Sequence, residues 1–98
     1  MEVPGASQHK LTVCLYEFLA SAFLLYVILL GGSAVGVTFV VFVLILATSP
    51  VSGGHFNPAI TIAVYIAQKE YKRNFALMIL IFLFQIAGGL AGAALAWS

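Results

Sequence analysis

The sequence predicts an all-α membrane protein with three transmembrane helices and one shorter, re-entrant half-helix. Of its 98 residues, 63% are hydrophobic and 7% are charged, whereas a soluble domain carries roughly a quarter charged residues. Three apolar stretches are long enough to cross a bilayer, and one further stretch is too short to do so. The outer surface is therefore expected to face a lipid bilayer, which is the first partner that the sequence predicts.

The first apolar run, residues 11–49, is too long for a single span. As one helix it would measure roughly 58 Å at 1.5 Å per residue, and the hydrocarbon core of a bilayer is only about 30 Å thick. The only good break is Gly31-Gly32-Ser33. We therefore predict helices over about 11–30 and 34–49, the second ended by Pro50.

The next stretch joins a glycine-rich segment, residues 51–56, to a short helical pattern that begins with Asn57-Pro58. A half-helix over residues 58–68 would be roughly 17 Å long. That length is too short for a span, and apolar segments of this size are candidates for re-entrant elements. After a charged cluster at 69–73, the last apolar stretch predicts a third spanning helix over residues 74–97.

The distribution of charge predicts the orientation. The basic residues are Lys10, Lys69, Lys72 and Arg73. Positive residues favour the cytoplasmic side, and every one of these falls on one side of the predicted arrangement. Residues 1–10 are then expected to form a cytoplasmic N-terminal tail, and residues 11–98 to form a multi-pass membrane domain whose half-helix returns to the side from which it entered.

The start of the half-helix is the part of the sequence best suited to a polar path. Asn57 is a strong helix N-cap, and Pro58 is favoured at the first helical position. Irregular backbone survives in a membrane only where protein buries it or where it lines a watery cavity. Gly53 and Gly54 let the backbone turn tightly and expose carbonyls, so a row of carbonyls is expected to lead to the helix start as a polar stripe. A cation on this path would meet the positive helix end. The plainer alternative is a helix start within an ordinary loop.

The segment SGGHFNPAIT, residues 52–61, resembles the first N-P-A segment of the aquaporin and glycerol-facilitator family, the major intrinsic proteins. Glu17-Phe18 resembles the glutamate-phenylalanine pair of the family's first helix. Gln85 and Gly88 resemble its glutamine and glycine in the third. The resemblance covers about 11–97 and implies one repeat of the aquaporin fold, whose full channel holds two repeats of inverted topology.

The resemblance also implies roles for single residues. Asn57 would donate a hydrogen bond to passing water, and Pro58 and Ala59 would hold the tip that meets a second half-helix. The carbonyls of residues 53–55 would line the path, and Glu17 would brace the re-entrant loop. From physics alone, a carboxylate in a span should face the bundle interior. A proton relay is the alternative role for this residue.

The sequence departs from the family pattern at the expected selectivity filter. The filter position in the second helix falls on Val37, where water-selective members carry an aromatic residue, and Phe39 is the alternative if the register differs. Valine would leave this side of the filter wider and apolar. The second N-P-A segment and the filter arginine belong to another repeat, so we expect a second half as partner, supplied by a longer chain of which this is a fragment or by a separate protein. The resemblance further implies a homotetramer for the complete channel.

The expected function is a passive channel for water, with small neutral solutes such as glycerol as further candidates. The alternative is a non-conducting membrane subunit that retains the fold for assembly or regulation. An enzyme is not expected, because no nucleophile–base pair or nucleotide-binding loop is present. Neither a metal site nor a cofactor is expected, since His55 lacks nearby ligands and Cys14 is the only cysteine. No basic run suits nucleic acid.

Small residues recur on one face of the last predicted helix. Gly88 and Gly92 are four positions apart, as are Gly89 and Ala93, a spacing that allows two helices to approach closely. We favour packing against another helix of the same chain. A contact between protomers is the alternative.

Overall fold

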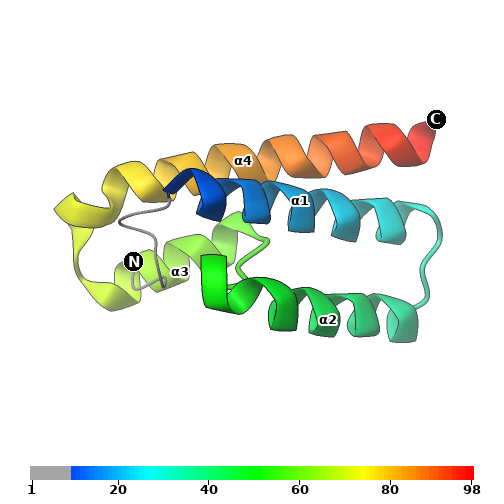
Figure 1. Cartoon of the computed structure of the whole chain (residues 1–98), viewed down its shortest axis with the longest axis horizontal. Helices are drawn as coiled ribbons and strands as arrows, with labels where there is room; N and C mark the ends of the chain where they lie inside the picture. Colours follow the sequence, from blue (N-terminus) through cyan, green and yellow to red (C-terminus); the bar gives the residue numbers. More distant parts are fainter. Residues whose placement is uncertain (1–9) are drawn as a thin grey trace.

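The computed structural model describes residues 10–98, which form four helices and no strands. They are α1 (Lys10–Leu29), α2 (Ala34–Ser52), α3 (Pro58–Gln68) and α4 (Tyr71–Trp97) (Figure 1). Three of them are long and apolar enough to cross a membrane, and α3 is a shorter apolar helix. The predicted fold class is therefore confirmed: three spans and one half-length helix.

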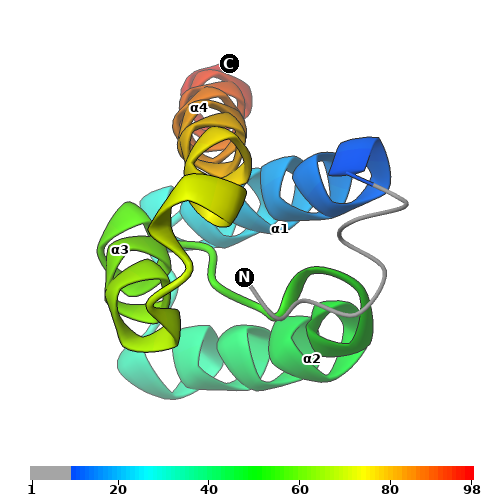
Figure 2. The same cartoon turned by 90° about the vertical axis from the view of Figure 1, so that its left-hand side faces the viewer.

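The helix α1 lies between α4 and α2, and α3 occupies a separate corner beside α4 (Figures 1 and 2). Figure 1 shows α3 beginning near the middle of the molecule and ending close to the start of α4. Its first residue therefore lies deep between the two ends of the spanning helices. From this point at mid-span, α3 runs back to the end of the molecule where α1 and α4 begin.

The contact between α1 and α4 depends on two glycines. A β-carbon at Gly88 would collide with the backbone carbonyl of Phe18, and one at Gly92 would collide with that of Ala22. The absence of side chains lets the two backbones approach closely. The predicted packing of these glycines within the chain is confirmed. Toward the start of α1 the contact becomes an apolar core made of Val13, Cys14, Leu77, Met78 and Ile81.

The predicted end of the second helix is wrong, because α2 continues through Pro50 to Ser52. A proline in the last turn removes only one backbone hydrogen bond, and its fixed φ suits a helix. The helix ends instead at Gly53, a left-handed residue with φ of 86° whose N–H donates to the carbonyl of Ser49 at 3.0 Å. This is the usual glycine end of a helix.

The last helix begins at Tyr71, three residues earlier than predicted. The charged residues Lys72 and Arg73, expected in a connecting segment, form its first turn. The N–H of Asn74 donates to the carbonyl of Glu70 at 3.0 Å and closes that turn. Of the expected tail over residues 1–10, Lys10 belongs to α1, and the remainder lies outside the described residues.

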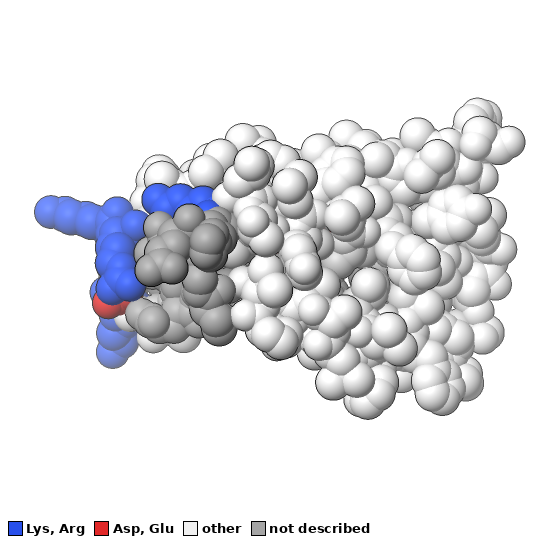
Figure 3. All heavy atoms as spheres, in the orientation of Figure 1, with Lys and Arg blue, Asp and Glu red and all other residues white. Residues whose placement is uncertain are grey.

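Charge and hydrophobicity divide the surface. Figure 3 shows lysine and arginine side chains gathered at one end of the molecule, and the described residues on the rest of the visible face are uncharged. Many large apolar side chains are exposed along the helices. Among them, Leu46, Leu83 and Leu90 are 63%, 58% and 68% exposed. Such a surface is stable only in lipid or against further protein. The protein is an integral membrane protein.

Candidate functional site

The start of α3 is organised by Asn57. Its backbone is extended, with φ of −142° and ψ of 128°, and its side-chain Oδ1 accepts a hydrogen bond from the N–H of Ala59 at 2.8 Å. Pro58 occupies the first helical position, and the N–H of Thr61 donates to the carbonyl of Asn57 at 3.1 Å. The cap uses the amide oxygen and leaves the Nδ2 group of this exposed residue able to donate outward.

The loop before Asn57 turns through three left-handed residues. Gly53 and Gly54 have φ of 86° and 68°, which glycine adopts at no steric cost. Phe56 has φ of 58°, a conformation that costs an ordinary residue roughly 1–2 kcal/mol. The surrounding contacts must therefore hold Phe56 in place.

Glu17 on α1 supplies those contacts. Its side chain is fully buried, and each of the two carboxylate oxygens accepts two hydrogen bonds. Oε1 accepts from the N–H of Phe56 at 2.9 Å and from Nε2 of Gln85 at 2.8 Å. Oε2 accepts from Oγ of Ser52 at 2.6 Å and from the N–H of His55 at 3.3 Å. One carboxylate thus joins α1, the end of α2, the loop and α4.

A second set of polar contacts ties α3 to the same cluster. Nε2 of Gln85 also donates to Oγ1 of Thr61 at 3.0 Å, and Thr61 is hydrogen-bonded to Nδ1 of His55 at 3.0 Å. On the other side, Oγ of Ser21 donates to the carbonyl of Phe56 at 3.4 Å. Both backbone groups of the left-handed Phe56 are therefore engaged by α1. We refer to Glu17, Ser52, His55, Thr61 and Gln85 as the buried polar cluster.

The structure brings most of the predicted site residues together, with one exception. Glu17 and the segment 53–59 form one continuous region, whereas Val37 lies in the first turns of α2, at the far end of that helix from Gly53. Phe39, the alternative filter residue, is 66% exposed, and Val37 is half-buried.

Ser52, Thr61 and Ser21 were not predicted as partners of this site. Each is a small polar residue in an apolar helix, and each is almost fully buried. A hydroxyl within an apolar helix was the available sequence signal, since a hydroxyl that becomes buried needs a hydrogen-bond partner, but it does not say which partner. Within the described residues, no group of three histidine, cysteine or acidic side chains could hold a metal ion.

The arrangement can present donors to a polar solute without offering a reactive carboxylate. Because four hydrogen bonds occupy Glu17, its geometry is that of a positioned acceptor in the protein interior. Asn57 is exposed at the positive end of α3, and its Nδ2 group is the donor it can offer, because the N–H of Ala59 is bonded to its own Oδ1.

Comparison with known proteins gives one match. Residues 28–97 match the family model described as MIP, Major intrinsic protein. No curated protein and no solved structure matches the chain. The matched stretch contains α2, α3, α4 and the loop, while Glu17 lies before it and owes its place in the site to the structure. Because the match covers well over half of the sequence, the chain belongs to the major intrinsic protein family, whose members are membrane channels of the aquaporin type.

Proposed function

We propose that this chain forms one half of a passive pore for water, in which the start of α3 contributes the donor at mid-membrane. The observation that carries the proposal is the split use of the Asn57 side chain. Its Oδ1 is committed to the N–H of Ala59, so its orientation is fixed. Its Nδ2 group then faces away from the helix and can donate to a water molecule.

The loop supplies the complementary acceptors. The left-handed residues Gly53, Gly54 and Phe56 reverse the direction of the chain repeatedly before Asn57. We propose that the carbonyls of residues 53–55 lead to the Asn57 amide, and that water passes by exchanging hydrogen bonds along them. The positive end of α3 would disfavour cations at the same point.

A second repeat would complete this pore. Asn57, Ala59 and Ile60 are exposed at the tip of α3, and α2 buries only Thr48 and Ser52. These surfaces support a partner half whose own half-helix meets the tip at Pro58-Ala59. We further propose that complete pores assemble as homotetramers and that the N-terminus is cytoplasmic, in line with the basic end seen in Figure 3.

Val37 leads us to propose that small neutral solutes such as glycerol pass together with water. Valine is smaller than an aromatic side chain and presents only methyl groups, so a filter that includes it would be wide and apolar on this side. The experiment that tests the proposal is stopped-flow light scattering of vesicles that contain the protein in its native pore-forming assembly.

A sucrose gradient reports the permeability to water, and a glycerol gradient reports the entry of the solute through the later reswelling. We expect water flow well above that of empty vesicles, together with reswelling in glycerol. Water flow equal to that of empty vesicles would contradict the channel proposal. Water flow without faster glycerol entry would retain the water pore and contradict the wide filter.

A further inference from the structure

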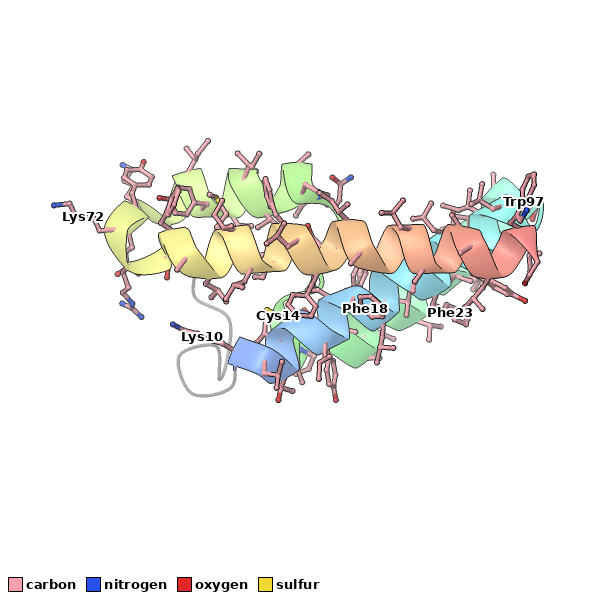
Figure 4. All side chains as sticks on the ribbon, turned by 90° about the horizontal axis from the view of Figure 1, so that it is seen from above. Lys10, Cys14, Phe18, Phe23, Lys72 and Trp97 are labelled. Atoms are coloured by element: carbon pink, nitrogen blue, oxygen red, sulfur yellow. The ribbon has the colours of Figure 1, made fainter. Side chains whose placement is uncertain are left out.

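The corner between α3 and α4 carries the strongest charge on the described surface. Lys69, Lys72 and Arg73 lie there within five consecutive residues, and Lys10 lies at the same end of the molecule (Figures 3 and 4). The one acidic residue of the corner, Glu70, bonds through Oε1 to Nη1 of Arg73 at 3.2 Å. The corner is therefore positive even after this ion pair is counted, and it would attract an anion.

Two adjoining shallow, open hollows give the corner two chemical halves. One, of about 390 Å³, is lined by the consecutive residues 69–73 and is basic. The other, of about 400 Å³, is lined by Tyr65, Tyr71, Lys72 and Phe75 and is mainly aromatic. Tyr71 and Lys72 line both, so the basic half passes directly into the aromatic half.

Hydrogen bonds between the ends of the two helices hold this shape. The hydroxyl of Tyr65 donates to the carbonyl of Tyr71 at 2.6 Å, and the hydroxyl of Tyr71 donates to the carbonyl of Ile66 at 3.3 Å. The two rings lie 5.3 Å apart. A site that is already formed loses less entropy when a ligand binds.

We propose that this corner binds one anionic phospholipid, with the phosphate at Lys69 and Lys72 and the upper part of the acyl chains along Tyr65 and Phe75. The corner lies at the start of α4, a spanning helix of 27 residues, so it falls at the level of the lipid headgroups. Tyrosines favour that level. A free phosphate would use the basic half alone, whereas a phospholipid matches both halves in the order in which they enter the membrane.

This inference does not depend on the proposed water pore, because it requires only the membrane location. The test measures the preference of the purified full chain, in neutral detergent, for spin-labelled phosphatidylglycerol over spin-labelled phosphatidylcholine. Lys72→Gln removes the basic side chain that lines both hollows. Lys10→Gln is the matched control, since it removes the same charge at the same end but lines neither hollow.

We expect Lys72→Gln to lower the preference about fivefold, the effect of one basic side chain close to an anionic lipid, and Lys10→Gln to change it far less. Equal losses in the two variants would show diffuse attraction and overturn the site. Glu70→Gln should raise the preference, because it removes the only acidic group of the corner. A damaged fold could not produce that gain.

Two further measurements separate a phospholipid from a free anion. Excess inorganic phosphate should not displace phosphatidylglycerol, and Phe75→Ala should weaken its binding. Full displacement by phosphate, with no effect of Phe75→Ala, would show a simple anion site and overturn the proposal. Binding of phosphatidylcholine as strong as that of phosphatidylglycerol would also overturn it.

Discussion

The two ends of α3 meet the same backbone requirement in different ways. A left-handed residue other than glycine lies at each end. Phe56 lies before the helix and Lys69 after it, both with φ of 58°. At the first end, Glu17 on α1 accepts the N–H of Phe56, and Ser21 donates to its carbonyl. At the second end, the supporting hydrogen bonds join residues only five or six positions apart.

Contacts between residues far apart in the sequence are needed only at the first end. The last turn of α3 has only to reverse direction at the membrane surface, where water and lipid headgroups satisfy free polar groups. The first turn lies near mid-span, where an unpaired backbone group costs several kcal/mol and where the direction of Asn57 matters for the proposed pore. The buried polar cluster draws on all four helices to fix that direction.

The largest effect should come from Glu17→Ala. The change removes the acceptor of four hydrogen bonds. Ser52 and Gln85 keep a second acceptor each, in Thr48 and Thr61, whereas the backbone N–H groups of His55 and Phe56 lose the acceptor that the structure gives them. Because each unsatisfied buried donor costs about 1–3 kcal/mol, we expect the free energy of unfolding to fall by at least about 3 kcal/mol. Unfolding by SDS in mixed micelles, followed by circular dichroism, measures this.

Glu70→Ala is the matched control at the other end of α3. It removes an acidic residue whose ion pair with Arg73 is largely exposed, and such pairs contribute only about 0–1 kcal/mol. Similar losses from the two variants would contradict the contrast between the ends.

The next largest effect concerns the packing of α1 against α4, which places Glu17 next to Gln85. Gly92→Ala would place a methyl group against the carbonyl of Ala22, and we expect a loss of about 1–3 kcal/mol, as for other overpacked sites. Gly89→Ala has room, because Leu25 Cγ lies 3.8 Å from the new atom. Alanine exceeds glycine in helix propensity by up to about 1 kcal/mol, so this control should stabilise the protein. The same SDS titration measures both variants. We expect the free energy of unfolding to fall for Gly92→Ala and to rise for Gly89→Ala.

Tyr65→Phe should weaken the local support of the second end. It removes the 2.6 Å hydrogen bond to the carbonyl of Tyr71 and should cost about 1 kcal/mol. Tyr71→Phe removes a longer bond of 3.3 Å and should cost less. Amide hydrogen exchange in residues 66–72 would report the change locally, and greater exchange at the loop before α3 than at this corner would argue against a local role.

The smallest effect should be a gain. Lys69→Gly removes the backbone strain of a left-handed lysine, but glycine loses more conformational entropy on folding. We therefore expect the free energy of unfolding to rise by about 0.5 kcal/mol. Phe56→Gly relieves the same strain but also removes a partly buried ring, so it should gain less or lose stability. Thermal unfolding in a neutral detergent compares the two. A destabilised Lys69→Gly variant would mean that the lysine side chain holds the corner.

Local signals predicted the parts of the fold that local chemistry decides. Asn57-Pro58 starts a helix through its own cap, and α3 does begin there. The end of α2 was predicted too early, because a proline in the final turn removes only one backbone hydrogen bond. The left-handed Gly53 that follows is what ends the helix. The first turn of α4 was missed because its charged residues resemble a loop, although charge is tolerated where a spanning helix meets the headgroups.

The partners within the site were harder to predict from sequence. The cost of a carboxylate in lipid indicated that Glu17 faces inward, and it does. Which hydroxyls would meet it depends on the rotation of each helix about its axis. Ser52 and Thr61 therefore could be recognised only once α1 and α4 were placed by the contacts of Gly88 and Gly92. The tyrosine contacts of the corner likewise depend on side-chain directions across a tight turn.

The most direct test of the proposed pore is the water permeability of Asn57→Ser, measured by stopped-flow in vesicles that hold the native assembly. Serine keeps the helix cap but lacks the outward amide. Ser98→Ala is the control, because it removes a helix-end hydrogen bond outside the proposed pore, the one from Oγ of Ser98 to the carbonyl of Leu95 at 2.8 Å. We predict about a fivefold lower water permeability for Asn57→Ser, the equivalent of one hydrogen bond, and an unchanged permeability per folded protein for Ser98→Ala. Wild-type permeability in Asn57→Ser would contradict the proposed role of the Asn57 amide in water passage.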